Sequence, residues 1–222
     1  MRRRAKIIIS ITVFACIIMG IVDAIIQPGY LAKSIVKIML FSLLPVLYAL
    51  RHKECNLKSL FAFRKNGFYI AIALGVGVYV VILTAYTLFR NVFDFSGLTS
   101  SLTASTGVSK ENFLFVALYI SFVNSFLEEF FFRGFSFLCL KECANRNLAY
   151  TFSSAMFALY HIAMMVGWFS LPVVLLALLG LYIGGIVFSY VNERFNTIYL
   201  SWLVHMFANF ATNTIGYILF DA

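Results

Sequence analysis

Long and nearly uninterrupted apolar runs constrain the fold of this chain more than any other feature. Of its 222 residues, 62% are hydrophobic and only 12% are charged, and the mean hydropathy is +0.93. One soluble core cannot bury that much apolar surface, whereas a bilayer takes about 20 apolar residues per helix. We therefore expect an all-α, polytopic membrane helix bundle. Seven spans are predicted, at about 7–26, 35–50, 68–89, 112–140, 148–166, 171–191 and 198–219.

The spans predict one integral membrane domain over residues 1–222, because no internal repeat or long linker divides them. An Arg-rich start before the first apolar run is also typical of a signal peptide. That run is about twenty residues long, however, and no small-residue cleavage site follows it. The first span is therefore expected to remain as a helix.

The distribution of positive charge predicts the orientation. With the N-terminus inside, the inner segments carry twelve Lys and Arg residues and the outer ones four, which favours a cytoplasmic N-terminus in the cell membrane. The net charge of +8 then reflects topology and contact with membrane lipids, and no nucleic acid partner is predicted. The inner residues are Arg2, Arg3, Arg4, Lys6, Arg51, Lys53, Lys58, Arg64, Lys65, Lys141, Arg146 and Arg194, and the outer ones are Lys33, Lys37, Arg90 and Lys110.

Four cysteines are too few and too scattered to predict a disulfide framework: Cys16, Cys55, Cys139 and Cys143. Cys55 and Cys143 fall on the reducing side of the membrane in the predicted orientation, so free thiols are expected.

Charged side chains inside the fourth predicted span are the first candidates for function. Glu128, Glu129 and Arg133 lie in an apolar stretch, where ionisable groups are costly and mark functional sites. At helical spacing Glu129 and Arg133 share one face, and Glu128 points about 100° away. Arg133 is therefore expected to neutralise Glu129 and leave Glu128 free. The alternative is a purely structural ion pair between helices.

Two of the three histidines also lie within predicted spans, each at helical spacing from a partner. His161 follows Phe157 by four residues, and His205 precedes Asn209 by four. An isolated intramembrane His or Asn is often only a hydrogen-bonded packing residue. Here Glu128, His161 and His205 are expected at similar depth, with Asn124 as a plausible neighbour of Glu128.

This set favours activation of water by a carboxylate, with neighbouring donors receiving the developing oxyanion. Other hydrolytic chemistries lack their residues. A zinc protease of the His-Glu-x-x-His type and a Gly-x-Ser-x-Gly serine hydrolase have no matching motif. An aspartyl intramembrane protease needs two membrane aspartates, and only Asp23 qualifies.

The three pieces together resemble the CAAX protease and bacteriocin-processing enzyme family, also called the CPBP or Abi family. Its pattern is Glu-Glu-x-x-x-Arg, Phe-x-x-x-His and His-x-x-x-Asn/Asp on successive helices. Here these are Glu128-Glu129-x-x-x-Arg133, Phe157-x-x-x-His161 and His205-x-x-x-Asn209. The resemblance covers about residues 113–215, the motif-bearing core.

The resemblance implies an intramembrane endopeptidase, related to CAAX prenyl endopeptidases, that acts on a peptide or a lipidated membrane protein. It implies that Glu128 activates water and that His161 holds and polarises it. His205 and Asn209 would form the oxyanion pocket, and Glu129 with Arg133 would shape the site. No organic cofactor or metal is expected, although two His and two Glu leave zinc open as an alternative.

Two further functions stay open. A non-catalytic membrane scaffold or bacteriocin self-immunity protein would keep the fold and the motifs without the chemistry. A proton-coupled transporter would also use intramembrane charges, but it would typically show internal repeats or broken helices.

Overall fold

The computed structural model describes residues 3–52, 55–93, 99, 103–104, 107–165 and 169–221. The regular structure of these residues is helical, and they contain no strand. The prediction of an all-α membrane bundle is therefore confirmed. By length and composition, six helices in the described part are able to cross a membrane. They are Arg3–Ile26, Leu31–Arg51, Phe68–Phe89, Phe113–Cys143, Arg146–Met165 and Leu171–Phe195.

The seventh predicted span corresponds to α12 (Ile198–Asp221), which is 24 residues long but is not among these six. Its polar residues His205, Asn209 and Asn213 recur every four positions. They therefore lie on one face of the helix, which in a membrane protein faces the bundle interior. These polar residues make the helix less apolar than the other six.

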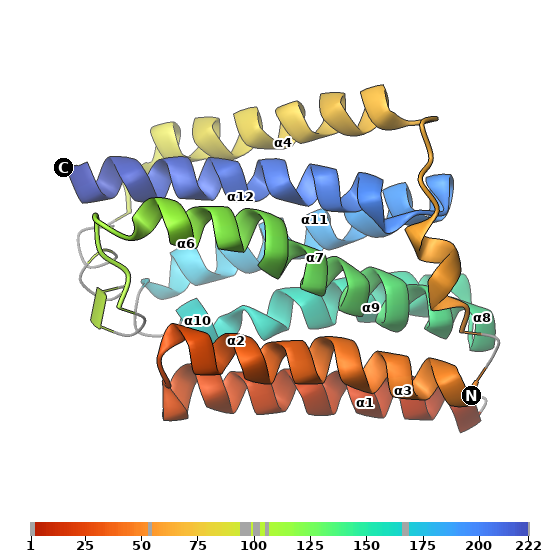
Figure 1. Ribbon diagram of the computed structural model, residues 1–222. Helices are drawn as coiled ribbons and strands as arrows, with labels where there is room; N and C mark the ends of the chain where they lie inside the picture. Colours follow the sequence, from red (N-terminus) through yellow and green to blue (C-terminus); the bar gives the residue numbers. More distant parts are fainter. Residues whose placement is uncertain are drawn as a thin grey trace.

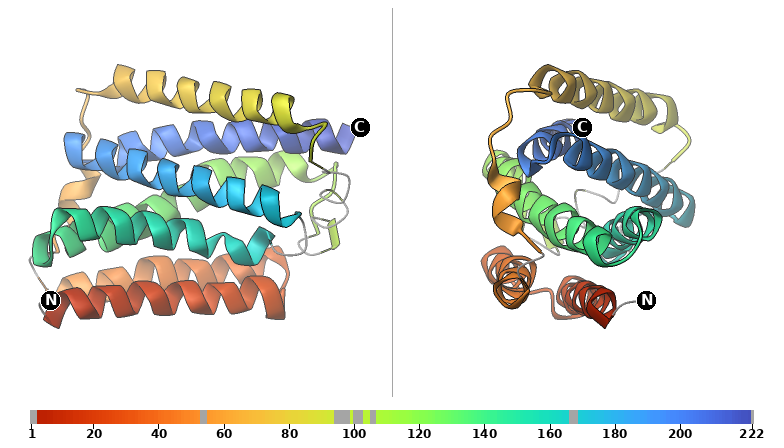
Figure 2. Two further views of the ribbon diagram at one scale, coloured as in Figure 1. Left: turned by 180° about the vertical axis from the view of Figure 1, so that it is seen from behind. Right: turned by 90° about the vertical axis from the view of Figure 1, so that its right-hand side faces the viewer.

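The N-terminal hairpin forms one side of the bundle (Figures 1 and 2). Its first arm is α1 (Arg3–Ile21) with the π-helical turn η1 (Val22–Ile26). Its second arm is continuous through α2 (Tyr30–Ile38), η2 (Met39–Leu43) and α3 (Leu44–Arg51). The predicted orientation assigns Lys33 and Lys37 to an outer segment. In the structure both residues lie within α2. Lys37 is 5% exposed.

The other helices run back and forth along the same direction, with α4 on the side opposite the hairpin (Figure 2). The two chain ends lie at opposite ends of the bundle (Figure 1). In chain order the elements are η3 (Leu57–Phe61), α4 (Phe68–Phe89), α6 (Phe113–Tyr119), η4 (Ile120–Asn124), α7 (Ser125–Glu128), η5 (Glu129–Cys139), α8 (Leu140–Cys143), α9 (Arg146–Tyr160), α10 (Ile162–Met165) and α11 (Leu171–Phe195).

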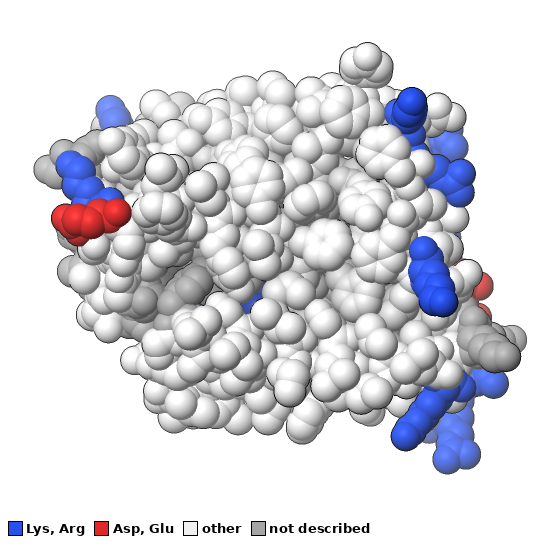
Figure 3. Space-filling view, viewed as in Figure 1, with Lys and Arg blue, Asp and Glu red and all other residues white. Residues whose placement is uncertain are grey.

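The surface has the distribution of charge expected of a membrane protein. In the view of Figure 3 charged atoms gather at the two ends of the bundle, and a wide uncharged face lies between them. Large apolar side chains such as Tyr69, Val81 and Leu175 are exposed on the helices. Exposed apolar area of this extent indicates contact with lipid.

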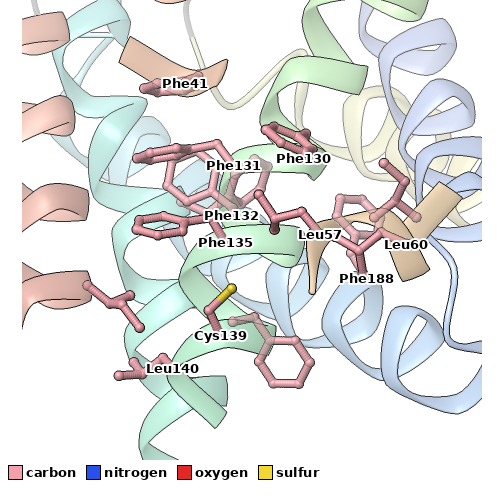
Figure 4. Packing of buried hydrophobic residues seen from close by; sticks show 14 of the residues in the cluster. Phe41, Leu57, Leu60, Phe130, Phe131, Phe132, Phe135, Cys139, Leu140 and Phe188 are labelled. Carbon is pink, nitrogen blue, oxygen red and sulfur yellow. The ribbon is translucent and has the colours of Figure 1, made fainter. Parts of the chain in front are cut away.

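Aromatic rings fasten the hairpin to the centre of the bundle (Figure 4). The fully buried ring of Phe41 in η2 stacks on Phe131 with 4.1 Å between the centroids. It also meets the rings of Phe132 and Tyr160 edge-on, at 5.5 and 5.4 Å. Stacked and edge-to-face pairs of this kind add to the stabilisation from burial. They fix η2 against η5 and the end of α9.

The segment that follows the hairpin is bonded covalently to η5. Cys55 and Cys139 form a disulfide with Cα atoms 5.0 Å apart, so the prediction of free thiols is wrong for these two, whereas Cys16 and Cys143 keep their thiol groups. Close packing of η3 on η5 brings the pair together. A Cβ on Gly134 would lie 2.8 Å from Leu60 Cδ1, so glycine permits this approach.

Candidate active site

The two adjacent glutamates lie where α7 ends and η5 begins. Hydrogen bonds in the π-helical η5 span five residues, so consecutive side chains diverge less than in an α-helix. Glu128 and Glu129 are both buried, and both approach the imidazole of His205. The predicted divergence of the two carboxylates therefore does not separate them into different environments.

Arg133 and Glu129 form the ion pair that their spacing predicts. Arg133 Nη1 lies 3.4 Å from Glu129 Oε1, and both side chains are fully buried. The guanidinium lies over the rings of Phe157 and Phe188, with its Cζ atom 4.1 and 4.9 Å from their centroids. Cation–π contacts are strongest where the cation is desolvated. The pair is thus enclosed by aromatic rings.

His161 and His205 converge on one oxygen of Glu128. The Nε2 atoms of His161 and His205 lie 3.9 and 3.7 Å from Glu128 Oε2. The ring of Phe157 meets the two imidazoles edge-on, at 4.8 and 5.6 Å between centroids, and Phe188 stacks on His205 at 4.9 Å. Three helical segments that are distant in sequence thus meet at one point.

In each imidazole, the hydrogen bond made by Nδ1 determines whether Nε2, the nitrogen nearer Glu128, carries a proton. His161 Nδ1 lies 2.7 Å from the carbonyl oxygen of Phe157, which can only accept, so Nδ1 carries a proton. His205 Nδ1 lies 3.0 Å from Glu129 Oε1 and donates to this carboxylate. In their neutral forms both rings therefore present an Nε2 lone pair to the site, and a doubly protonated ring would present a donor.

Glu128 is not free, contrary to the prediction from helical spacing. Lys37 Nζ lies 2.5 Å from Glu128 Oε1, and Asn124 Nδ2 donates to the same oxygen at 2.9 Å. The prediction failed because this cation comes from a helix 91 residues earlier in the chain. Asn124, predicted as a neighbour from its place one turn before Glu128, does contact it.

Asn209 lies one turn beyond His205 on α12 and is partly buried. Its Nδ2 donates to the carbonyl oxygen of Ile120 at 3.2 Å. The amide nitrogen carries a second proton. Among the contacts of the described residues, none joins Asn209 directly to Glu128 or to either histidine.

Sequence reasoning missed two contributors to the site, Lys37 and Phe188. A lysine inside an apolar span is itself a functional signal, and Lys37 lies within the predicted span 35–50, so that signal was present. Phe188 belongs to a helix without a motif, and nothing in its sequence context distinguishes it from other lipid-facing or core aromatics.

The arrangement of the side chains at the site shows whether they could bind a metal ion. In the described part of the chain no group of three or more His, Cys, Asp and Glu residues is arranged to hold a metal ion. Glu129 supports His205 in the way a carboxylate supports a metal-bound histidine, a partner that the sequence did not reveal. Lys37 nevertheless places a cation on Glu128, which opposes a second cation at that carboxylate.

Fold and site together define a polytopic helical membrane protein with a buried centre of carboxylates and histidines. Residues 110–211, a little under half of the chain, match the model of the family described as type II CAAX prenyl endopeptidase Rce1-like. The family supports a CAAX-type intramembrane endopeptidase in general, and hence a protease. No curated protein and no solved structure matches the chain.

Proposed function

We propose that this protein is an intramembrane endopeptidase in which Glu128 activates water to hydrolyse a peptide bond of a peptide or a membrane-anchored protein. The observation that carries the proposal is the convergence of His161 and His205 on Glu128 Oε2, within 4 Å. The family points to a CAAX-type or other peptide precursor as substrate. The concentration of basic residues at the end that holds the N-terminus supports a cytoplasmic N-terminus in the cell membrane.

The attacking water belongs between Glu128 Oε2 and His161 Nε2. These atoms are 3.9 Å apart, a gap that one water bridges with hydrogen bonds of about 2.8 Å. Both accept when His161 is neutral, so the water directs one proton to each and turns its lone pairs to the substrate. Glu128 takes one of these protons as the oxygen–carbon bond forms.

His205 lies between two carboxylates, with Glu129 at Nδ1 and Glu128 beyond Nε2. In its doubly protonated form it donates from Nε2 to the carbonyl oxygen as that oxygen becomes negative, and Asn209 is the second donor proposed for this pocket. The tetrahedral intermediate then collapses. The C–N bond breaks, and Glu128 returns its proton to the leaving amine.

A hollow on the lateral face is a route for the substrate. Figure 3 shows it between α2 and α6, with basic atoms at its inner end. Because it opens on the uncharged face of the bundle, a lipid-anchored chain could approach it from the bilayer. We propose that the site works without a resident metal or organic cofactor, since its charged groups already form two cation–carboxylate pairs.

The decisive experiment replaces Glu128 with Gln. This change keeps the shape of the side chain and removes the base, so hydrolysis should fall by about 10²- to 10⁴-fold. The assay uses detergent-purified protein with quenched-fluorescence peptides, namely a farnesylated CAAX peptide and unprenylated membrane-anchored peptides. Glu111→Gln is the control, because Glu111 lies exposed ahead of α6.

Retained cleavage by Glu128→Gln would rule out this mechanism. If the wild-type protein cleaves none of the peptides, while Glu128→Gln still supports the protein's role in cells, the endopeptidase assignment fails. That pair of results would favour a non-catalytic scaffold or self-immunity protein.

A further inference from the structure

Lys37 is a buried lysine at the centre of a membrane bundle. Its side chain is 6% exposed, and it lies on α2, outside the family segment 110–211. Lysine is almost never buried without a partner, and in a membrane protein such a residue marks a functional site. The family resemblance assigns it no role.

Lys37, Asn124 and Glu128 form a closed triangle of hydrogen bonds. Lys37 donates to Glu128 Oε1 at 2.5 Å and also to Asn124 Oδ1. Asn124 in turn donates from Nδ2 to the same glutamate oxygen at 2.9 Å. In each of these three hydrogen bonds a nitrogen donates and an oxygen accepts. One oxygen of Glu128 is therefore held by two donors.

The other oxygen of Glu128 is the one that faces the histidines. The carboxylate is planar, so anchoring Oε1 from the side of α2 also sets the direction of Oε2, toward His161 and His205. Without Lys37 the carboxylate keeps only the Asn124 contact among these anchors, and rotation about its terminal bond becomes easier because that torsion is broad.

The place of Lys37 is itself fixed by the packing of the hairpin. Its ammonium lies 5.4 Å from the ring centroid of Phe41 and 5.0 Å from that of Tyr160. Phe41 follows one turn later on the same arm and stacks on Phe131. The aromatic contact that joins the hairpin to η5 thus also aligns the lysine with Glu128.

The balance of charge among the buried groups also favours a role for Lys37 beside Glu128. The centre contains two carboxylates, Glu128 and Glu129, and two cations, Lys37 and Arg133. Removing one partner of a buried pair leaves an uncompensated charge, which is strongly destabilising. Of the Lys and Arg residues paired with these two carboxylates, the motif segment brings Arg133 and the hairpin supplies Lys37.

We infer that Lys37 is a positioning residue for Glu128, and that the N-terminal hairpin completes the active site by supplying it. This inference rests on the proposed function, in which Glu128 is the base. The opposite reading of the same contact is inhibition, in which Lys37 holds Glu128 away from its chemistry and must leave before catalysis.

The test compares Lys37→Met with Lys37→Arg in the full chain, using the peptide assay. Methionine keeps the length of the side chain and removes its charge, so kcat should fall by roughly 10- to 100-fold, with KM changed less than about 3-fold. Arginine restores a cation and should recover part of the loss. Lys6→Met is the control, because Lys6 is an exposed lysine on the other arm of the same hairpin.

A second measurement does not depend on activity. Thermal unfolding of detergent-purified Lys37→Met, Glu128→Gln and the double variant forms a cycle. Lys37→Met should lower Tm, and adding Glu128→Gln should restore most of the loss, because the uncompensated carboxylate is then gone.

The outcomes separate the two claims. Wild-type kcat in Lys37→Met, beside an inactive Glu128→Gln, overturns the positioning role and leaves the proposed function standing. A rise in kcat in Lys37→Met establishes inhibition instead. Cleavage by Glu128→Gln overturns the proposed function, and the unfolding cycle still decides whether Lys37 and Glu128 are coupled. Additive changes in Tm would refute that coupling.

Discussion

The N-terminal hairpin and the motif-bearing segment 110–211 contribute to the same centre by different means. In the motif segment one pair, Glu129 with Arg133, lies one helical turn apart, beside contacts that His161 and His205 make with Glu128 across helices. The hairpin reaches the centre only through contacts between residues distant in sequence, such as that from Lys37 to Glu128. Local spacing produces the first kind of contact, whereas only the packing of whole helices produces the second. The chemistry and its alignment thus come from different parts of the chain.

The largest expected effect lies on the motif side of this comparison. Replacing His205 with Ala removes the imidazole between the two glutamates and should lower kcat/KM by about 10²- to 10⁴-fold. Kinetics with the quenched peptides measure it. His52→Ala is the matched control, since the ring of His52 packs at a tilt against Tyr48, away from the site. Equal activity of the two variants would show that the motif histidines are packing residues only.

A smaller effect should come from loosening the hairpin without touching its lysine. Phe41→Ala removes a fully buried ring, which typically costs about 3–5 kcal/mol of stability. Tm should fall, and kcat should fall with it because Lys37 loses its alignment. Phe14→Ala, on the exposed face of α1, should change stability by less than about 0.5 kcal/mol. A destabilised Phe41→Ala with full kcat would show that hairpin packing and alignment are independent.

The smallest expected effect is that of metal removal. Chelators should leave kcat/KM unchanged, and elemental analysis of detergent-purified protein should find far less than one zinc per chain. The reason is the cation that each region already places beside a carboxylate, Lys37 from the hairpin and Arg133 from the motif segment. One tightly bound zinc per chain would contradict this and would make Glu129 the support of a metal-binding His205.

The sequence predicts what depends on composition and on spacing within one helix. Apolar length yields the bundle and nearly all of its membrane-sized helices, and the four-residue interval yields the pairing of Glu129 with Arg133. The polarity of His161 and of His205 within apolar runs marks each as a candidate, although their convergence on Glu128 depends on packing. Each of these signals lies within a few turns of one helix.

What the sequence does not reveal depends on tertiary packing. The contact from Lys37 to Glu128 spans 91 residues, and the Cys55–Cys139 disulfide spans 84. No periodicity connects positions that far apart. Both errors arose from assigning a residue to one side of the membrane by charge or redox environment, when packing of the hairpin and of η3 onto η5 decides its neighbours.

The π-helical stretch η5 makes the number of residues in this segment as important as their identity. It runs for 11 residues from Glu129 to Cys139, and each wide turn contains one residue more than an α-helix would use for its hydrogen bond. Deleting a single residue between Glu129 and Cys139 would rotate Cys139 relative to the glutamates, so that it could not face Cys55 while they face the histidines. This region should therefore tolerate exchange of side chains far better than any change in length, and natural variation within it should consist of substitutions without insertions or deletions.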